Sequence, residues 1–204
     1  MNRILLLNAS PLGEAAQGQR LARELLAALG RQHPQLTLVE RDLGLQHLPP
    51  LPANYAYAVS SAAPLHDPAF EVSEALIGEL EQCDALFITT PMHNFAVPAA
   101  LKLWIDYVLR IHRTFAPAPD GSKHGLLGDR PVYVLVSSGG FHQGERARQP
   151  DFLTSYLRHV LNTLGLFDLH FTYLQGLAHG EAAMDNALSA ARARLALEPL
   201  FRSL

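Results

Sequence analysis

The sequence lacks the features that mark several classes of protein. Its one cysteine, Cys83, excludes an intramolecular disulfide framework and favours a reducing compartment. The net charge of −3 means that the protein has no overall positive charge to attract nucleic acid or an anionic membrane surface. No apolar run approaches the length of about 18 residues that a membrane-spanning helix needs. We therefore expect a cytoplasmic protein whose partners include neither nucleic acid nor a membrane.

Several catalytic motifs are also missing. The ten histidines are scattered and form no H-E-x-x-H or comparable ligand cluster, so no metal site is expected. No G-x-G-x-x-G follows the first apolar run, which disfavours a dinucleotide-binding Rossmann unit. Gly13 and Gly18 have P-loop spacing, but Gln19-Arg20 replaces the Lys-Ser/Thr pair that nucleoside triphosphate hydrolysis requires. Ser137 and Ser138 lack the G-x-S-x-G elbow of a serine hydrolase.

What the sequence does contain is an alternation of strand-like and helix-like segments. With 204 residues, 49% of them hydrophobic, the chain fits one domain spanning 1–204. The predicted strands are Ile4–Leu7, Thr37–Leu43, Ala85–Thr89, Val132–Val136 and Leu169–Leu174. The predicted helices start at Gln17, Phe70, Ala99, Phe152 and Glu181 and run to Gly30, Glu81, Ile111, Leu164 and Phe201. This alternation predicts an α/β fold with a doubly wound five-stranded parallel sheet, order 2-1-3-4-5, and helices on both faces.

Two segments between these elements are predicted to be irregular. Residues 44–68 contain five prolines and read as a long connection, which fits either a binding loop or a plain surface excursion. Residues 115–125, with Pro117, Pro119 and Gly121, read as a second loop.

The predicted strand order places a ligand site between the first and third strands, where the order reverses. The loops at that point are 8–18 and 91–97. Pro91 and Pro98 fix the backbone around the second loop, and the N–H groups from Met92 to Val97 are available to a ligand. An ordinary strand-to-helix connector would show the same prolines.

These loops favour a mononucleotide bound without a metal. A phosphate would lie at Ser10 and at the helix start formed by Ala16-Gln17-Gly18, where free N–H groups and the helix dipole favour anions. A planar ring would lie against 91–95, and Gly139-Gly140 would let the backbone approach it. Flavodoxin-like proteins hold FMN in this way.

The chain resembles the homodimeric, flavodoxin-like family of FMN-dependent NADH azoreductases and quinone reductases. Pro91-Met92-His93-Asn94-Phe95 is similar to the family's Pro-Met-Tyr-Asn-Phe, and Ser137-Ser138-Gly139-Gly140, followed by His142, is similar to its Ser-x-Gly-Gly. The resemblance implies that FMN is the cofactor, NADH or NADPH the co-substrate, and a quinone or aromatic azo compound the acceptor. It implies FMN contacts from Ser10, Ala16, Gln17, Gly18, Pro91, Met92, His93, Asn94, Phe95, Ser137, Ser138, Gly139, Gly140 and His142. No side chain is assigned as a catalytic acid or base. A role for His142 in stabilising negative charge on the reduced flavin remains one possibility.

The sequence departs from the family pattern at the phosphate loop. The family's Ser-x-Ser triplet is Ala16-Gln17-Gly18 here, and losing two hydroxyl hydrogen bonds to a phosphate would cost about 2–4 kcal/mol. Arg20, one turn further on, could compensate. The alternatives are a non-catalytic electron carrier, a flavin-binding regulatory module, or a protein that has lost its flavin. The apolar helix after Pro98 favours a homodimer, which speaks against the carrier.

Overall fold

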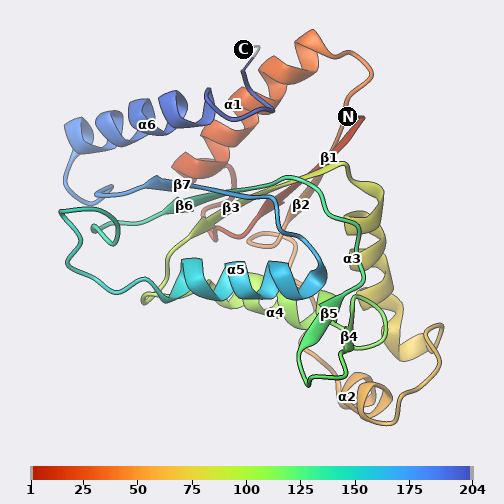
Figure 1. The fold of residues 1–204 in the computed structure, drawn as a ribbon. Coiled ribbons are helices and arrows are strands. Elements are labelled where there is room, and N and C mark those ends of the chain that lie inside the picture. Colours follow the sequence, from red (N-terminus) through yellow and green to blue (C-terminus); the bar gives the residue numbers. More distant parts are fainter. Residues whose placement is uncertain (1, 203–204) are drawn as a thin grey trace.

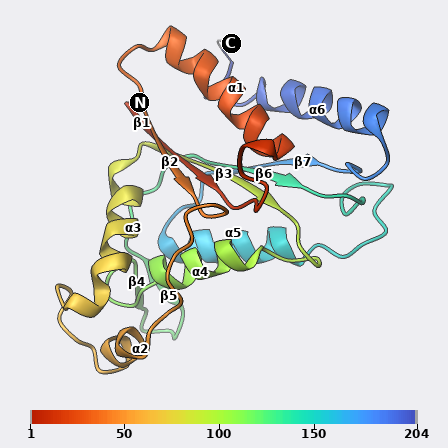
Figure 2. The same ribbon diagram turned by 180° about the vertical axis from the view of Figure 1, so that it is seen from behind.

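The computed structural model describes residues 2–202 of the chain. Its central sheet has five parallel strands in the order β2-β1-β3-β6-β7 (Figure 1 and Figure 2). These strands are β1 (Arg3–Asn8), β2 (Thr37–Asp42), β3 (Ala85–Pro91), β6 (Val132–Ser137) and β7 (Leu169–Leu174). Counted among themselves along the chain, they have the order 2-1-3-4-5. The predicted doubly wound topology is therefore confirmed.

Helices cover both faces of the sheet (Figure 1). One face carries α1 (Gln17–Gln32) and α6 (Glu181–Leu195), and the other carries α3 (Glu71–Gln82), α4 (Ala99–Val108) and α5 (Phe152–Leu164). The side chains of β1 alternate between the two layers: Leu5 and Leu7 join the core under α3, α4 and α5, whereas Ile4 and Leu6 join the core under α1 and α6. Burial on both faces explains why the central strands are continuous apolar runs.

The connection at 44–68, predicted as unstructured, contains a helix. α2 spans Ala53–Ser60, and the 3₁₀ turn η2 (Pro68–Phe70) leads into α3. Tyr55 anchors α2 because its buried ring meets the rings of Phe70 and Tyr107 edge-on at 5.6 and 5.3 Å. A short helix that is fixed by distant aromatic contacts leaves little periodic signal in its own sequence.

The predicted loop at 115–125 is a small hairpin instead. β4 (Phe115–Pro117) pairs antiparallel with β5 (Lys123–Gly125). The hairpin packs closely on the turn after α5, since a Cβ atom at Gly125 would lie 2.2 Å from the backbone nitrogen of Gly165. Only glycine fits at this position.

Several helix ends differ from the prediction, that of α3 by one residue. α1 continues through Gly30 to Gln32, α4 stops at Val108, and α6 stops at Leu195. A glycine inside a helix costs only about 1 kcal/mol, so it need not end the helix. Phe201, predicted to be helical, is in a turn after α6, yet its ring is buried against Phe87.

Within residues 2–202, no helix has both the length and the apolar character to cross a bilayer. The same residues contain no cluster of three or more histidine, cysteine, aspartate or glutamate side chains that could hold a metal ion. Cys83 is a buried free thiol, and burial raises its pKa. An unreactive, space-filling cysteine is consistent with this environment.

Candidate functional site

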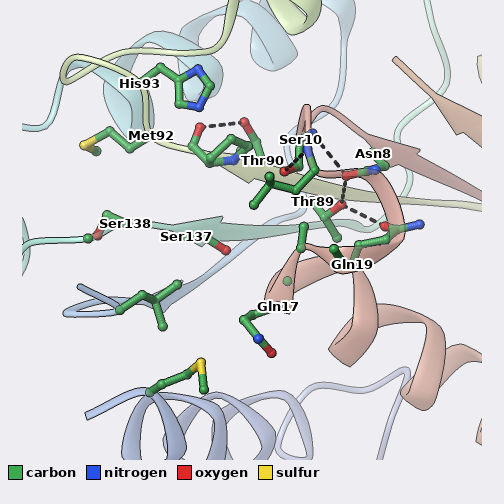
Figure 3. A pocket seen from close by; sticks show the side chains of 18 residues that line it. Asn8, Ser10, Gln17, Gln19, Thr89, Thr90, Met92, His93, Ser137 and Ser138 are labelled. Atoms are coloured by element: carbon green, nitrogen blue, oxygen red, sulfur yellow. Dashed lines mark hydrogen bonds between the residues drawn. The ribbon is translucent and has the colours of Figure 1, made fainter. Parts of the chain in front are cut away.

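A cavity of about 410 Å³ lies at the carboxyl ends of β1, β3 and β6, beside the first turn of α1 (Figure 3). This is the edge of the sheet where α/β proteins bind ligands, and the volume suits a small molecule. The lining residues are Asn8, Ser10, Leu12, Ala15, Ala16, Gln17, Gly18, Gln19, Thr89, Thr90, Pro91, Met92, His93, Ser137, Ser138, Gly139, Leu177 and Met184. Both predicted loops therefore contribute to one cavity.

The first turn of α1 provides an anion-binding end to the cavity. Ala16 is the N-cap residue, and its side chain makes no capping hydrogen bond. The first intrahelical bond runs from Arg20 N–H to the Ala16 carbonyl at 3.0 Å, so the N–H groups of Gln17, Gly18 and Gln19 precede the helical ladder. Such groups, together with the helix dipole, attract phosphate.

No lysine, arginine, aspartate or glutamate is among the residues that line the cavity. The compensating role considered for Arg20 is not supported, because Arg20 is exposed and its Nε donates to the Glu14 carbonyl at 3.2 Å. An anion at this end would be held by backbone N–H groups, with the Ser10 and Ser137 hydroxyls nearby.

Gly18 allows α1 to start close to the end of β6. A Cβ atom at position 18 would lie 2.9 Å from the Ser137 hydroxyl oxygen. The glycine thus leaves room for a hydroxyl that lines the cavity. The sequence indicated both residues but not their contact.

A buried polar network, which the sequence did not predict, supports the cavity floor (Figure 3). The Asn8 Oδ1 atom accepts hydrogen bonds from the Ser10 N–H and from the Thr89 hydroxyl, both at 3.1 Å. The Thr89 hydroxyl also lies 3.0 Å from Gln19 Oε1. These contacts tie the ends of β1 and β3 to α1. The available signal was the position of Asn8 and Thr89, polar residues at the ends of apolar runs.

The segment after β3 forms a tight hairpin turn. His93 and Ala96 exchange two backbone hydrogen bonds of 3.0 Å, and the two residues between them have positive φ angles, 49° for Asn94 and 72° for Phe95. The prediction that all N–H groups from Met92 to Val97 are free is therefore wrong, because Met92 N–H also donates to the Ser137 carbonyl at 2.7 Å. Pro91, Met92 and His93 line the cavity, whereas Asn94 and Phe95 do not.

The segment after β6 is held by the loop after β7. The N–H groups of Gly176, Leu177 and Ala178 donate to the carbonyls of 140, 138 and 139 at 3.1 to 3.2 Å. Ser137, Ser138 and Gly139 line the cavity, and Gly140 does not. Gly140 instead faces Gln149, since a Cβ atom there would lie 2.6 Å from the Gln149 side chain. The same loop brings Leu177 to the cavity, and Met184 follows from α6. Sequence reasoning missed both residues.

His142 is not part of the cavity wall. Its side chain is fully buried behind Ser138, with Nδ1 at 3.0 Å from the Ser138 hydroxyl oxygen. Burial lowers the pKa of its imidazole, and the nearby carboxylate of Asp151 opposes that shift. Direct contact between His142 and a bound ring, as the resemblance implied, does not follow from this geometry.

Comparisons with known proteins agree with this architecture. A family model described as flavodoxin-like fold matches residues 2–197. "FMN-dependent NADH:quinone oxidoreductase 4" of Pseudomonas fluorescens is 66% identical and covers 100% of this chain and 98% of its own length. "FMN-dependent NADH:quinone oxidoreductase 5" of Burkholderia lata is 54% identical and covers 91% of this chain and 90% of its own length.

Solved structures share the fold. An azoreductase from Bacillus anthracis superposes with a TM-score of 0.81 at 23% identity, covering 99% of this chain and 100% of its own. An FMN-dependent NADH-azoreductase of the same species, solved in complex with FMN, has a TM-score of 0.77 at 21% identity and covers 96% and 99% of the two chains. The chain therefore belongs to the flavodoxin-like family that includes the two FMN-dependent NADH:quinone oxidoreductases.

Proposed function

We propose that this protein is an FMN-dependent NAD(P)H oxidoreductase that reduces quinones by two electrons and cleaves aromatic azo compounds. The observation that carries the proposal is the cavity itself, in which an uncapped helix start meets the segments that follow β3 and β6. The 66% identical relative, named as an FMN-dependent NADH:quinone oxidoreductase, supports the same activity.

The lining residues fit FMN by their chemistry. The N–H groups of Gln17, Gly18 and Gln19 would bind the phosphate, together with the Ser10 hydroxyl. Pro91–His93 and Ser137–Gly139 would hold the ring system, and Leu177 and Met184 would cover its apolar part. When bound, FMN supplies the chemistry that accepts two electrons from the nicotinamide and passes them on. The protein residues bind and orient, and none is needed as an acid or base.

His93 sets this chain apart within that site. It lines the cavity where the related family usually has tyrosine, and it is the only ionisable side chain among the lining residues of the described chain. An imidazole donates from one ring nitrogen and accepts at the other, whereas a phenol does both at a single oxygen. We expect His93 to influence acceptor choice more than flavin affinity.

We also propose that the protein acts as a homodimer in the cytoplasm. The apolar residues of α4 that suggested a second subunit are used in the core of this chain: Leu101, Trp104, Ile105, Tyr107 and Val108 are buried. The remaining support is a pair of exposed rings, one of which follows the cavity-lining His93 by two residues. Phe95 is 41% and Phe152 61% exposed, and the two residues are joined by a backbone hydrogen bond of 3.0 Å. A second copy would cover such rings. Sedimentation measurements test this.

The first experiment is the visible spectrum of the purified protein with FMN, followed by anaerobic addition of NADH. A bound flavin band that bleaches, with quinone-dependent NADH consumption, is the expected result. A bound band that stays unbleached by NADH and by NADPH would mean an electron carrier or a regulatory module. If no flavin stays bound, the proposal is wrong.

A further inference from the structure

A serine, a histidine and an aspartate form a row that starts at the cavity and leads into the protein. The Ser138 hydroxyl oxygen lies 3.0 Å from His142 Nδ1, and His142 Nε2 lies 4.0 Å from Asp151 Oδ2. Within residues 2–202, the buried Nε2 atom has no hydrogen-bond partner. Ser138 alone among the three lines the cavity. His142 and Asp151 can therefore act on a bound group only through the Ser138 hydroxyl.

This hydroxyl has one proton and two acceptors. Ser138 Oγ is 2.9 Å from the Gly140 carbonyl and 3.0 Å from His142 Nδ1. One proton can serve only one of them. If Ser138 donates to Nδ1, its oxygen offers only lone pairs to the cavity. If instead Nδ1 carries a proton and donates to Ser138, the hydroxyl is free to donate to Gly140 or into the cavity.

The groups around His142 decide which arrangement prevails. Asp151 Oδ2 accepts hydrogen bonds of 2.6 Å from Gln143 Nε2 and from the Thr154 hydroxyl. Burial raises the pKa of Asp151, but these hydrogen bonds outweigh it and keep the pKa below its usual value, so Asp151 is an anion at neutral pH. The other titratable group, Tyr173, meets the imidazole edge-on at 5.3 Å and stays neutral because burial raises its pKa.

We propose that Ser138, His142 and Asp151 form a proton-coupled switch, in which protonation of His142 turns the Ser138 hydroxyl from an acceptor into a donor toward the bound flavin. The inference rests on the proposed function. At rest, a neutral imidazole with its proton on Nε2 faces Asp151, and Ser138 donates to Nδ1. Negative charge that accumulates in the cavity favours the imidazolium.

The proton balance of the switch is simple. One proton from solvent in the cavity bonds to Ser138 Oγ while the original hydroxyl proton moves to His142 Nδ1. A hydronium ion in the cavity becomes water: its O–H bond and the original Ser138 O–H bond break, while a new Ser138 O–H bond and an Nδ1–H bond form. The imidazole gains one positive charge opposite Asp151, and no electron moves within the row. Ser138 alone of the three lines the cavity, so it is the residue that meets the bound group. His142 and Asp151 are positioning residues.

The test uses the FMN-loaded protein and two readouts. The midpoint potential of the bound FMN is measured from pH 5 to pH 9, and the protonation of the His142 ring is followed by NMR in the oxidised and reduced states. We expect His142 to titrate at higher pH in the reduced protein. The plot of midpoint potential against pH should change slope at that pH, which gives a bend in the plot. Both H142Q and S138A should remove the bend contributed by the switch, while His142 still titrates in S138A. H159Q, which replaces an exposed histidine on α5, should leave the wild-type bend intact.

D151N isolates the aspartate, since asparagine can still cap α5. In this variant the His142 titration should move to lower pH. The proposal is overturned if S138A keeps the wild-type bend, if His142 titrates identically in both redox states, or if H142Q and S138A weaken FMN binding equally at every pH and change nothing else. Should the protein bind no FMN, the proposed function fails separately. The titration of His142 is then compared between flavin-free wild type and flavin-free D151N. If the midpoint pH is the same in both, the proposed pairing of His142 with Asp151 is wrong.

Discussion

Gly18 and Ser137 are in such close contact that any side chain at position 18 must displace the Ser137 hydroxyl. A Cβ atom on Gly18 would lie 2.9 Å from Ser137 Oγ, closer than such atoms normally approach. The start of α1 and the end of β6 therefore form one unit. The N–H groups at the helix start, where we propose that phosphate binds, and a cavity-lining hydroxyl depend on the same contact.

Replacing Gly18 with alanine should lower both stability and FMN affinity. Because the Ser137 hydroxyl can rotate away, we expect a modest loss, about 1 kcal/mol in unfolding free energy, and a several-fold weaker FMN affinity. Urea denaturation and flavin fluorescence titration measure these quantities. Gly30→Ala is the matched control, since a Cβ atom there meets nothing within 4 Å, and it should stabilise α1. If Gly18→Ala costs as much in the Ser137→Ala background as in the wild type, the contact is not the cause.

Ala16→Ser should restore part of the phosphate site that this sequence lacks. Ala16 is the N-cap of α1 and provides no side-chain hydrogen bond, so a serine hydroxyl can cap the helix or bind phosphate. We expect about 1 kcal/mol greater stability without FMN and about tenfold tighter FMN binding from one additional charge-assisted bond. Ala27→Ser, at an exposed position of the same helix, is the control and should leave FMN affinity unchanged. Unaltered affinity in Ala16→Ser would mean that the phosphate lies elsewhere.

The sheet could be predicted from the sequence because strands such as β1 and β6 are buried on both faces and must be apolar throughout. α2 could not, since the contacts of Tyr55 that hold it come from Phe70 and from Tyr107 on α4. The hairpin of β4 and β5 likewise depends on its close packing against Gly165. Elements that are fixed by distant contacts leave no periodic pattern in their own residues.

The site, too, could be predicted only where it does not depend on contacts between distant parts of the chain. Its two loops were predicted, because the carboxyl ends of adjacent parallel strands must meet. The direction in which the His142 side chain points could not be predicted. Side chains in a loop do not alternate between two faces as those of a strand do, and only the packing behind Ser138 sets this direction. Leu177 and Met184 were missed because the backbone bonds that bring residues 176–178 to 138–140 connect segments far apart in the sequence.

The buried imidazole of His142 should make stability depend on pH. Burial lowers its pKa in the folded state below the value of about 6.5 that an unfolded chain has. As pH falls below that value, the unfolded state binds the proton first, so the unfolding free energy should decrease until the folded pKa is passed. Denaturation midpoints between pH 7.5 and pH 5 measure this slope. The H142Q variant should show a shallower slope than wild type, and equal slopes would contradict the assignment.

His170 should hold the chain after α6 on the edge of the sheet. Its two ring nitrogens lie 2.7 Å from Asp168 Oδ1 and 2.6 Å from Glu198 Oε2, and its ring stacks on Tyr133 at 4.9 Å. The Glu198 side chain is 5% exposed, whereas that of Asp168 is 53% exposed, so the bond to Glu198 should dominate.

Replacing Glu198 with glutamine should therefore destabilise the protein by about 1–3 kcal/mol, because the buried carboxylate that contacts both His170 and Arg194 is lost. The matched variant Asp168→Asn should cost less than about 1 kcal/mol, as exposed pairs do. Hydrogen exchange should show faster exchange of amides in residues 196–202 in Glu198→Gln than in Asp168→Asn. Phe201 packs against Phe87 and Tyr133 from this same segment, so its release should also expose part of the core under α1 and α6. If the two variants are equally stable and exchange alike, the terminal segment is held by Phe201 rather than by the His170–Glu198 pair.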